Sequence, residues 1–99
     1  MSTTTLTKNE STRRFELTVD DKPAFIVYEP LGDSVLALTH TEVDPALEGK
    51  GVGSKLVEET LQYIDKQGMR VISTCPFVSA YIKRHPDWKR LLADDNAVA

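Results

Sequence analysis

The sequence has one cysteine, two histidines and no long apolar run among its 99 residues. The single Cys75 cannot form an intramolecular disulfide, and so few cysteines and histidines leave too few ligands for a structural zinc site. No stretch approaches the ~20 apolar residues of a membrane-spanning helix. The first ten residues lack the apolar segment of a secretory signal. We therefore expect a cytoplasmic protein that binds no metal and keeps Cys75 as a thiol.

An excess of positive charge is also missing. Twelve Lys and Arg residues against fifteen Asp and Glu residues give a formal net charge of −3. This balance argues against nucleic acid as a partner, because its binders usually carry a basic surface. The length suits one domain, which we expect at residues 11–92, between a flexible tail at residues 1–10 and a frayed end at residues 93–99.

The first half of the chain alternates between apolar and polar residues with a period of two. Phe15, Leu17 and Val19 predict one buried face of a strand, and the run at residues 24–29 is apolar on both faces, as in a central strand. Short turns between strands favour an antiparallel meander. The predicted order is a strand at residues 14–19, a turn at residues 20–23, a strand at residues 24–29, a turn at residues 30–33 and a strand at residues 34–43.

The second half changes to helical periodicity. Apolar residues from Val52 to Ile64 predict one face of a helix that Gly68 ends, and a short strand follows at residues 69–74. A strand, a crossover helix and a strand predict a parallel pair. Cys75 is the expected N-cap of a further helix, and residues 87–92 form a last short helix or turn. The fold class is α+β, with a mixed sheet.

The loop at residues 44–53 contains three alternate glycines, Gly49, Gly51 and Gly53. Glycine lets an anion approach the backbone, and the first amides of the following helix have no partner within it, so the loop is suited to phosphate. The spacing fits neither a P-loop nor a dinucleotide-binding fingerprint. A glycine-rich turn without a ligand remains the alternative.

The two parallel strands should end at the same edge of the sheet as this loop. Ligands of open α/β sheets bind at that edge. An anion held by the loop would therefore have its far end near Glu42, at the end of the first parallel strand, and near Cys75, which follows the second.

The segment Glu48–Gly53 resembles the pyrophosphate loop of the GCN5-related N-acetyltransferases, usually written Q/R-x-x-G-x-G/A. Arg13-Arg14-Phe15, His40-Thr41-Glu42-Val43, the loop, Cys75, Tyr81 and Lys83-Arg84-His85-Pro86 occur in the order of the small single-domain branch, and this resemblance covers residues 11–92. It implies a mixed sheet whose parallel strands splay apart, acetyl-CoA as donor and an amine as acceptor. The implied cofactor contacts are Val43, Gly49, Lys50, Gly51, Val52, Gly53 and Ser54. Glu48 departs from the family's Gln or Arg, which would weaken binding without abolishing it.

Four residues are candidates for the chemistry. Cys75 is a nucleophile, a bystander that lines the thioester end of the cofactor, or an inert buried side chain; a helix N-terminus favours its thiolate. His40 and Glu42 lie two residues apart on one strand, hence on one face, and either could accept the amine proton. A hydrogen-bonded histidine and a solvated carboxylate are the alternatives. Tyr81 is a general acid by resemblance, or an aromatic core residue.

The basic residues near the C-terminus form one cluster: Lys83, Arg84, His85, Lys89 and Arg90. This cluster attracts the cofactor's 3′-phosphate or an acidic partner, or is a solvated helix face. We expect Trp88 to be a packing anchor. The sequence does not identify the amine acceptor, which could be small or a protein. A CoA-binding regulatory module without catalysis, or an interaction domain without a ligand, remains an alternative.

Overall fold

The computed structural model describes residues 5–93. Its strands are β1 (Thr7–Asn9), β2 (Arg14–Val19), β3 (Lys22–Pro30), β4 (Val35–Val43) and β5 (Arg70–Ser73). Its α-helices are α1 (Val52–Lys66) and α2 (Pro76–Arg84), and its 3₁₀ helices are η1 (Pro45–Leu47) and η2 (Pro86–Leu91). None of the helices in this part of the chain is both long and apolar enough to cross a membrane.

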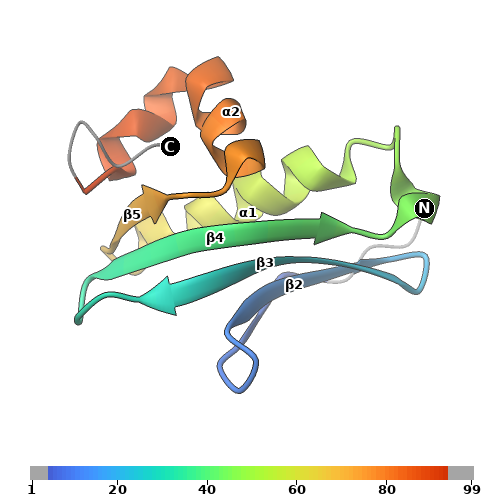
Figure 1. The fold of residues 1–99 in the computed structure, drawn as a ribbon, viewed down its shortest axis with the longest axis horizontal. Helices are drawn as coiled ribbons and strands as arrows, with labels where there is room; N and C mark the ends of the chain where they lie inside the picture. Colours follow the sequence, from blue (N-terminus) through green and yellow to red (C-terminus); the bar gives the residue numbers. More distant parts are fainter. Residues whose placement is uncertain (1–4, 94–99) are drawn as a thin grey trace.

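The strands form one sheet in the order β1-β2-β3-β4-β5. The pairs from β1 to β4 are antiparallel, and β4 pairs with β5 in parallel through the crossover that contains α1. The predicted meander, the parallel pair and the α+β class are therefore confirmed. Figure 1 shows α1 running behind the sheet and α2 beside β5, so that the front face of the sheet carries no helix.

The core lies between the sheet and α1. The apolar face of α1 is buried as its spacing predicted, with Leu56, Val57, Leu61 and Ile64 fully enclosed. Burial of this face drives the helix to pack on the sheet. On β3, every second side chain from Ala24 to Tyr28 faces the core, whereas the others are half-buried, so this central strand is buried on one face only.

Two local predictions near the N-terminus were wrong. Thr7–Asn9, expected in a flexible tail, pairs with β2. The turn expected at residues 20–23 consists of Asp20 and Asp21 alone, both with positive φ, as in a two-residue hairpin, so β3 already begins at Lys22. Residues 1–4 of the expected tail and residues 94–99 of the expected frayed end lie outside the described residues. Ala93, expected to fray, donates its N–H to the Val71 carbonyl at 2.9 Å.

A register shift between β3 and β4 reverses the faces of β4 near its end. Val27 pairs with His40, but the next residue of β3, Tyr28, pairs with Leu38, which leaves Thr39 as the extra residue of a β-bulge. Thr41 therefore faces the core side beyond the bulge, and His40 faces the side without helices.

Candidate active site

The two parallel strands separate halfway along β4. Their pairing runs from Val35 with Arg70 to Leu38 with Ser73, and the Thr74 N–H then donates to the Leu38 carbonyl at 3.0 Å. β4 continues to Val43, but the backbone of residues 39–43 has no partner on β5. Unpaired strand edges can hydrogen-bond an extended ligand, so this gap can hold a chain of amide groups.

The glycine loop leaves the first amides of α1 free. Gly49 and Gly51 have φ values of 78° and 73°, and Gly51 is the N-cap of α1. The loop's turns occupy the amides of Leu47, Glu48 and Lys50, and the helical hydrogen bonds begin with the Lys55 N–H to the Gly51 carbonyl at 3.1 Å. Within the described residues, the amides of residues 51–54 therefore have no backbone acceptor. Together with the helix dipole, they form a site for an anion.

A cavity of about 410 Å³, here called the loop pocket, opens beside these amides. Of the cofactor contacts implied by the sequence, Lys50 does not line it; its side chain is exposed. Sequence reasoning missed Leu47 and Phe77. The lining residues are Val43, Leu47, Glu48, Gly49, Gly51, Val52, Gly53, Ser54 and Phe77.

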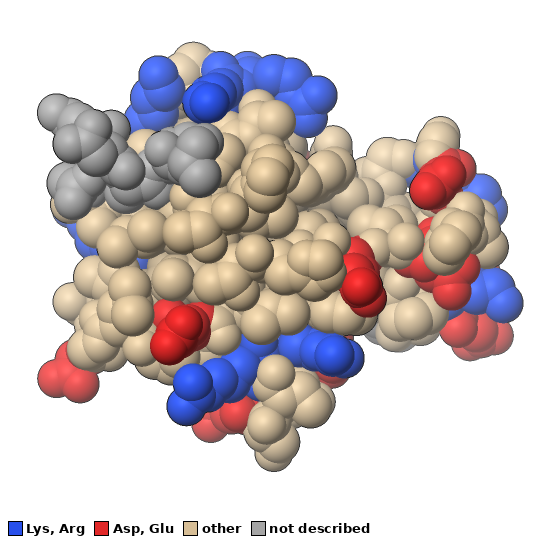
Figure 2. All heavy atoms as spheres, in the orientation of Figure 1, with Lys and Arg blue, Asp and Glu red and all other residues tan. Residues whose placement is uncertain are grey.

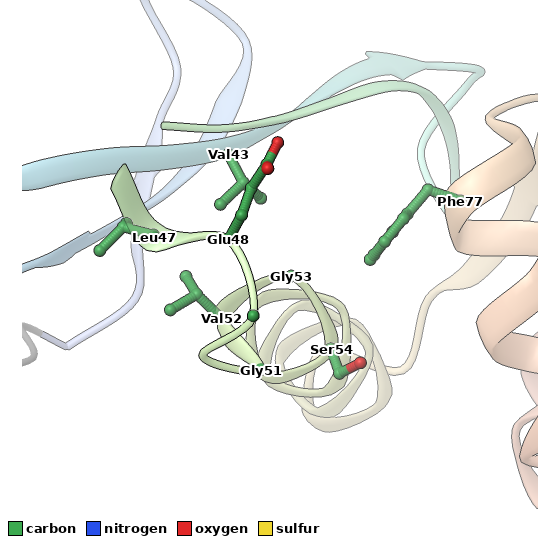
Figure 3. A pocket seen from close by; sticks show the side chains of 9 residues that line it. Val43, Leu47, Glu48, Gly51, Val52, Gly53, Ser54 and Phe77 are labelled. Atoms are coloured by element: carbon green, nitrogen blue, oxygen red, sulfur yellow. The ribbon is translucent and has the colours of Figure 1, made fainter. Parts of the chain in front are cut away.

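Phe77 and Gly53 form one wall of the loop pocket. Figure 3 shows the Phe77 ring reaching from the first turn of α2 toward Gly53 at the N-terminal end of α1. A Cβ atom on Gly53 would lie 2.6 Å from Cζ of Phe77, so the ring's position requires glycine there. The signal in the sequence was a glycine inside a helix, one residue beyond the N-terminus, where no turn requires it.

Glu48 lines the loop pocket without covering the amides. In Figure 3 its side chain extends beside Val43, and its carboxylate points away from Gly51 and Ser54. In this arrangement the negative charge of Glu48 would repel an anion bound to the amides, but the carboxylate would not contact it directly.

Cys75 lies where the strands separate. It is the N-cap of α2 and only 4% exposed, and its Sγ lies 3.3 Å from Oγ1 of Thr41 on β4. Ser73 Oγ donates to the Cys75 carbonyl at 3.3 Å and is 2.8 Å from Ser79 Oγ, which fixes the turn from β5 into α2. Thr41, which sequence reasoning did not single out, is thus the side chain that spans the gap to the thiol.

His40 and Glu42 share a face, as predicted, but not the face of Cys75. His40 Nε2 lies 3.2 Å from Glu42 Oε1, and both side chains are about 60% exposed. The bulge at Thr39 turns them to the side of the sheet without helices. The sequence predicted that the far end of a bound anion would lie near Glu42 and Cys75. The structure turns the Glu42 side chain to the side of the sheet opposite the Thr41 hydroxyl that contacts the thiol.

Tyr81 lies apart from the loop pocket. Its side chain is buried, and its ring packs on the His85 ring with centroids 4.3 Å apart. Burial raises the pKa of the Tyr81 phenol, and the negative charge of Glu58 adds to this effect, so the hydroxyl is protonated at neutral pH. Tyr81 and Cys75 belong to the same buried cluster, and no hydrogen bond joins their side chains among the described residues.

The basic cluster lies at the far end of α2 from Phe77. Figure 2 shows Lys and Arg gathered over α2 and the residues after it. Lys83, Arg84 and Lys89 are exposed, and the Arg90 guanidinium donates to both carboxylate oxygens of Asp65 at 2.8 and 2.7 Å. Trp88 is half-buried and packs against the core, as expected of a packing anchor.

Comparison with known proteins gives three findings. A family model described as GCN5-related N-acetyl-transferase matches residues 14–91. The proteins called NATD1 from mouse (Mus musculus) and human (Homo sapiens) are each 30% identical over 63 residues, which cover 64% of this chain and 57% and 56% of theirs. The chain thus matches less than two thirds of these relatives' length. A GCN5-like protein from Staphylococcus aureus, solved by NMR, has a similar fold, with a TM-score of 0.65, 19% identity and coverage of 90% of this chain and 89% of its own.

Proposed function

Because the chain belongs to the GCN5-related N-acetyltransferase family, we propose that it transfers the acetyl group of acetyl-CoA to an amine. The observation that carries this proposal is the row of amides at residues 51–54. They have no backbone acceptor in the part of the chain that the structure describes, and their residues line the loop pocket beside the gap between β4 and β5. A diphosphate and an amide-containing arm are the two parts of CoA that such a site suits.

Each part of the donor has a counterpart in the chain. The diphosphate would accept hydrogen bonds from the amides of residues 51–54. The pantetheine arm would follow the unpaired edge of β4 at residues 39–43, where its amides can replace the missing strand partner. This course leads the thioester toward Cys75 and Thr41.

The reaction requires a neutral amine, whose nitrogen attacks the thioester carbonyl carbon. A C–N bond forms and the C–S bond breaks; CoA leaves as a thiolate that takes up a proton, and the amine gives up a proton to a base. Glu42, paired with His40, is our candidate for that base. Cys75 offers a second route, in which its sulfur takes the acetyl group first and then passes it to the amine.

The Cys75 route and the direct route predict different results. With labelled acetyl-CoA and no amine, the Cys75 route gives an acetylated protein whose label maps to Cys75 by mass spectrometry. Cys75→Ala would then lose turnover, while the neighbouring exposed Thr74→Ala keeps it. Full turnover in Cys75→Ala would exclude an essential thiol and favour direct attack.

The burial of Cys75 and the outward face of Glu42 favour one second candidate, a CoA-binding regulatory module without catalysis. Isothermal titration with CoA, followed by an assay with a panel of amines, separates the candidates. Binding without transfer to any amine supports the regulatory module. No binding at millimolar CoA would remove both. We place the reaction in the cytoplasm, where Cys75 remains a free thiol.

A further inference from the structure

A second cavity lies on the other side of the end of β4. Its volume is about 500 Å³, within the ~300–1,000 Å³ typical of small-molecule sites. We call it the acceptor hollow. Phe25 and Glu42, which pair across β3 and β4 on the face without helices, form part of it. Its lining residues are Pro23, Phe25, Thr41, Glu42, Val43, Asp44 and Pro45.

The acceptor hollow connects to the candidate active site through two residues. Val43 lines both the acceptor hollow and the loop pocket. Thr41 lines the acceptor hollow, and its hydroxyl is the group 3.3 Å from Cys75 Sγ. Because the Thr41 side chain faces the core side, the end of β4 separates a ligand in the hollow from the thiol.

The lining of the acceptor hollow combines apolar side chains with two carboxylates. Phe25, Pro23 and Pro45 supply hydrocarbon surface, and Glu42 and Asp44 supply the only ionisable side chains of the lining. Each carboxylate has one oxygen in contact with the protein: Oδ1 of Asp44 accepts a hydrogen bond from the Ala46 N–H at 2.9 Å, and Oε1 of Glu42 lies 3.2 Å from Nε2 of His40.

The Phe25 ring already carries a cation from this chain. The Arg14 guanidinium lies 3.9 Å from the ring centroid, at an adjoining cavity of about 260 Å³ that Pro23 and Phe25 also line. Arg14 thus occupies a face of the ring, and Phe25 offers a ligand in the acceptor hollow hydrocarbon contact. An amine that also carries a carboxylate or phosphate would instead meet two acidic side chains.

On the basis of the proposed function, we infer that the acetyl acceptor is a linear alkylamine with a second positive charge, of the diamine or polyamine class. Its hydrocarbon chain lies on Phe25 and the prolines, and its far ammonium lies at Asp44, three residues and about 10 Å of extended strand from Thr41. Its near nitrogen, as the neutral amine, attacks the acetyl carbonyl at the gap. The C–N bond forms, the C–S bond breaks, and the amine proton passes to Glu42.

The test is a titration of the ¹⁵N-labelled protein, without acetyl-CoA, with three probes of equal chain length: 1,5-diaminopentane, 1-aminopentane and 5-aminopentanoate. We expect the diamine to shift the amide signals of Phe25, Glu42 and Asp44 and to bind at least fivefold more tightly than the monoamine, with no binding of the carboxylate. Asp44→Asn should remove the preference for the second charge, whereas Asp33→Asn, at the opposite end of β4, should retain it. Acetylation by the full protein should follow the same order of the three amines.

Each other outcome overturns the inference. Equal affinity for the diamine and the monoamine, or shifts of amide signals at other residues, would show that the hollow does not bind a second positive charge. Tighter binding of a lysine-rich peptide at the same residues would make the acceptor a protein rather than a small amine. Because this titration contains no CoA, its failure is distinct from a failure of CoA to bind, which would overturn the proposed function instead.

Discussion

Glu48 is the residue of the loop pocket that opposes the proposed ligand most directly. It stands where the family loop carries Gln or Arg, and its carboxylate lies at the rim of a site suited to an anion. A charge near an exposed helix N-terminus contributes ~0.3–1 kcal/mol. Glu48→Gln should therefore bind CoA about two- to fivefold more tightly in isothermal titration at low salt.

Salt provides the internal check on Glu48. The gain should shrink as ionic strength rises, because exposed charges are screened over ~8 Å at physiological salt. Glu10→Gln removes the same charge from an exposed position on the N-terminal strand's turn and should leave CoA affinity unchanged. If Glu48→Gln and the unaltered protein bound CoA with equal affinity at low salt, the Glu48 carboxylate would be too far from the bound ligand to repel it.

The residues of the site were predictable to different degrees. The glycines follow from loop spacing, because the backbone conformation that glycine allows is local, whereas Val52 and Ser54 were implied by the family resemblance. Phe77 and Thr41 were not predictable, since their contacts depend on how α2 meets α1 and how β4 passes β5. No local pattern encodes such contacts.

At the scale of elements, α1 has a left-handed glycine at each end. Gly51 at its start and Gly68 beyond its end have φ values of 73° and 70°, and a Cβ at either would meet no atom within 4 Å. Alanine should therefore destabilise the fold by a similar ~1–2 kcal/mol at both positions, through backbone strain alone.

The two glycines separate strain from binding. Gly51→Ala should lose CoA affinity by tenfold or more as well as stability, because it moves the amides of residues 51–54. Gly68→Ala should lose only stability. Thermal unfolding and isothermal titration of both variants check this, and an equal loss of CoA affinity in Gly68→Ala would mean that the amides hold no ligand.

The elements themselves were largely predictable, since periods of two and 3.6 residues report which face of a strand or helix is buried. β1 was missed because its three polar residues bury too little to alternate. The bulge at Thr39 was missed because an extra residue in β4 shows only in the register against β3. That one residue decides which way His40 and Glu42 face, so their shared face was predictable from their spacing and the direction of that face was not.

At the scale of the whole molecule, each face of the sheet carries one of the two cavities: the loop pocket on the face with helices and the acceptor hollow on the face without them. α1 and α2 enclose one side, where the loop pocket lies, and leave the other side open at the acceptor hollow. The end of β4 stands between the two. A donor and an acceptor could therefore approach from opposite sides and meet at the gap beside Cys75, without competing for one entrance.

Residues 90–93 cover the outer edge of β5, and we expect their contribution to the stability of the fold to depend on pH. The Arg90 guanidinium donates two hydrogen bonds to the carboxylate of Asp65 near the C-terminal end of α1. Leu92 forms a parallel β-bridge with Val71 on the outer edge of β5. The hydrogen bonds and charge of Arg90 hold the pKa of Asp65 below its ordinary value of 3.8. The folded protein thus binds this proton less readily than the unfolded chain, so the pair stabilises the fold above pH 4 and ceases to do so as the pH falls through the lowered pKa.

Asp65→Asn should therefore unfold at a lower urea concentration than the unaltered protein at pH 7, and the difference should narrow below pH 4. Circular dichroism during urea titration at pH 7, 5 and 3 measures it. Asp33→Asn serves as the control and should match the unaltered protein, because Asp33 is exposed and forms no ion pair with any residue from 5 to 93. CoA affinity at pH 7 should persist in Asp65→Asn, because the amides of residues 51–54 lie at the other end of α1. A midpoint difference that stays constant from pH 7 to pH 3 would mean that Arg90 closes this edge through packing rather than through the charge of Asp65.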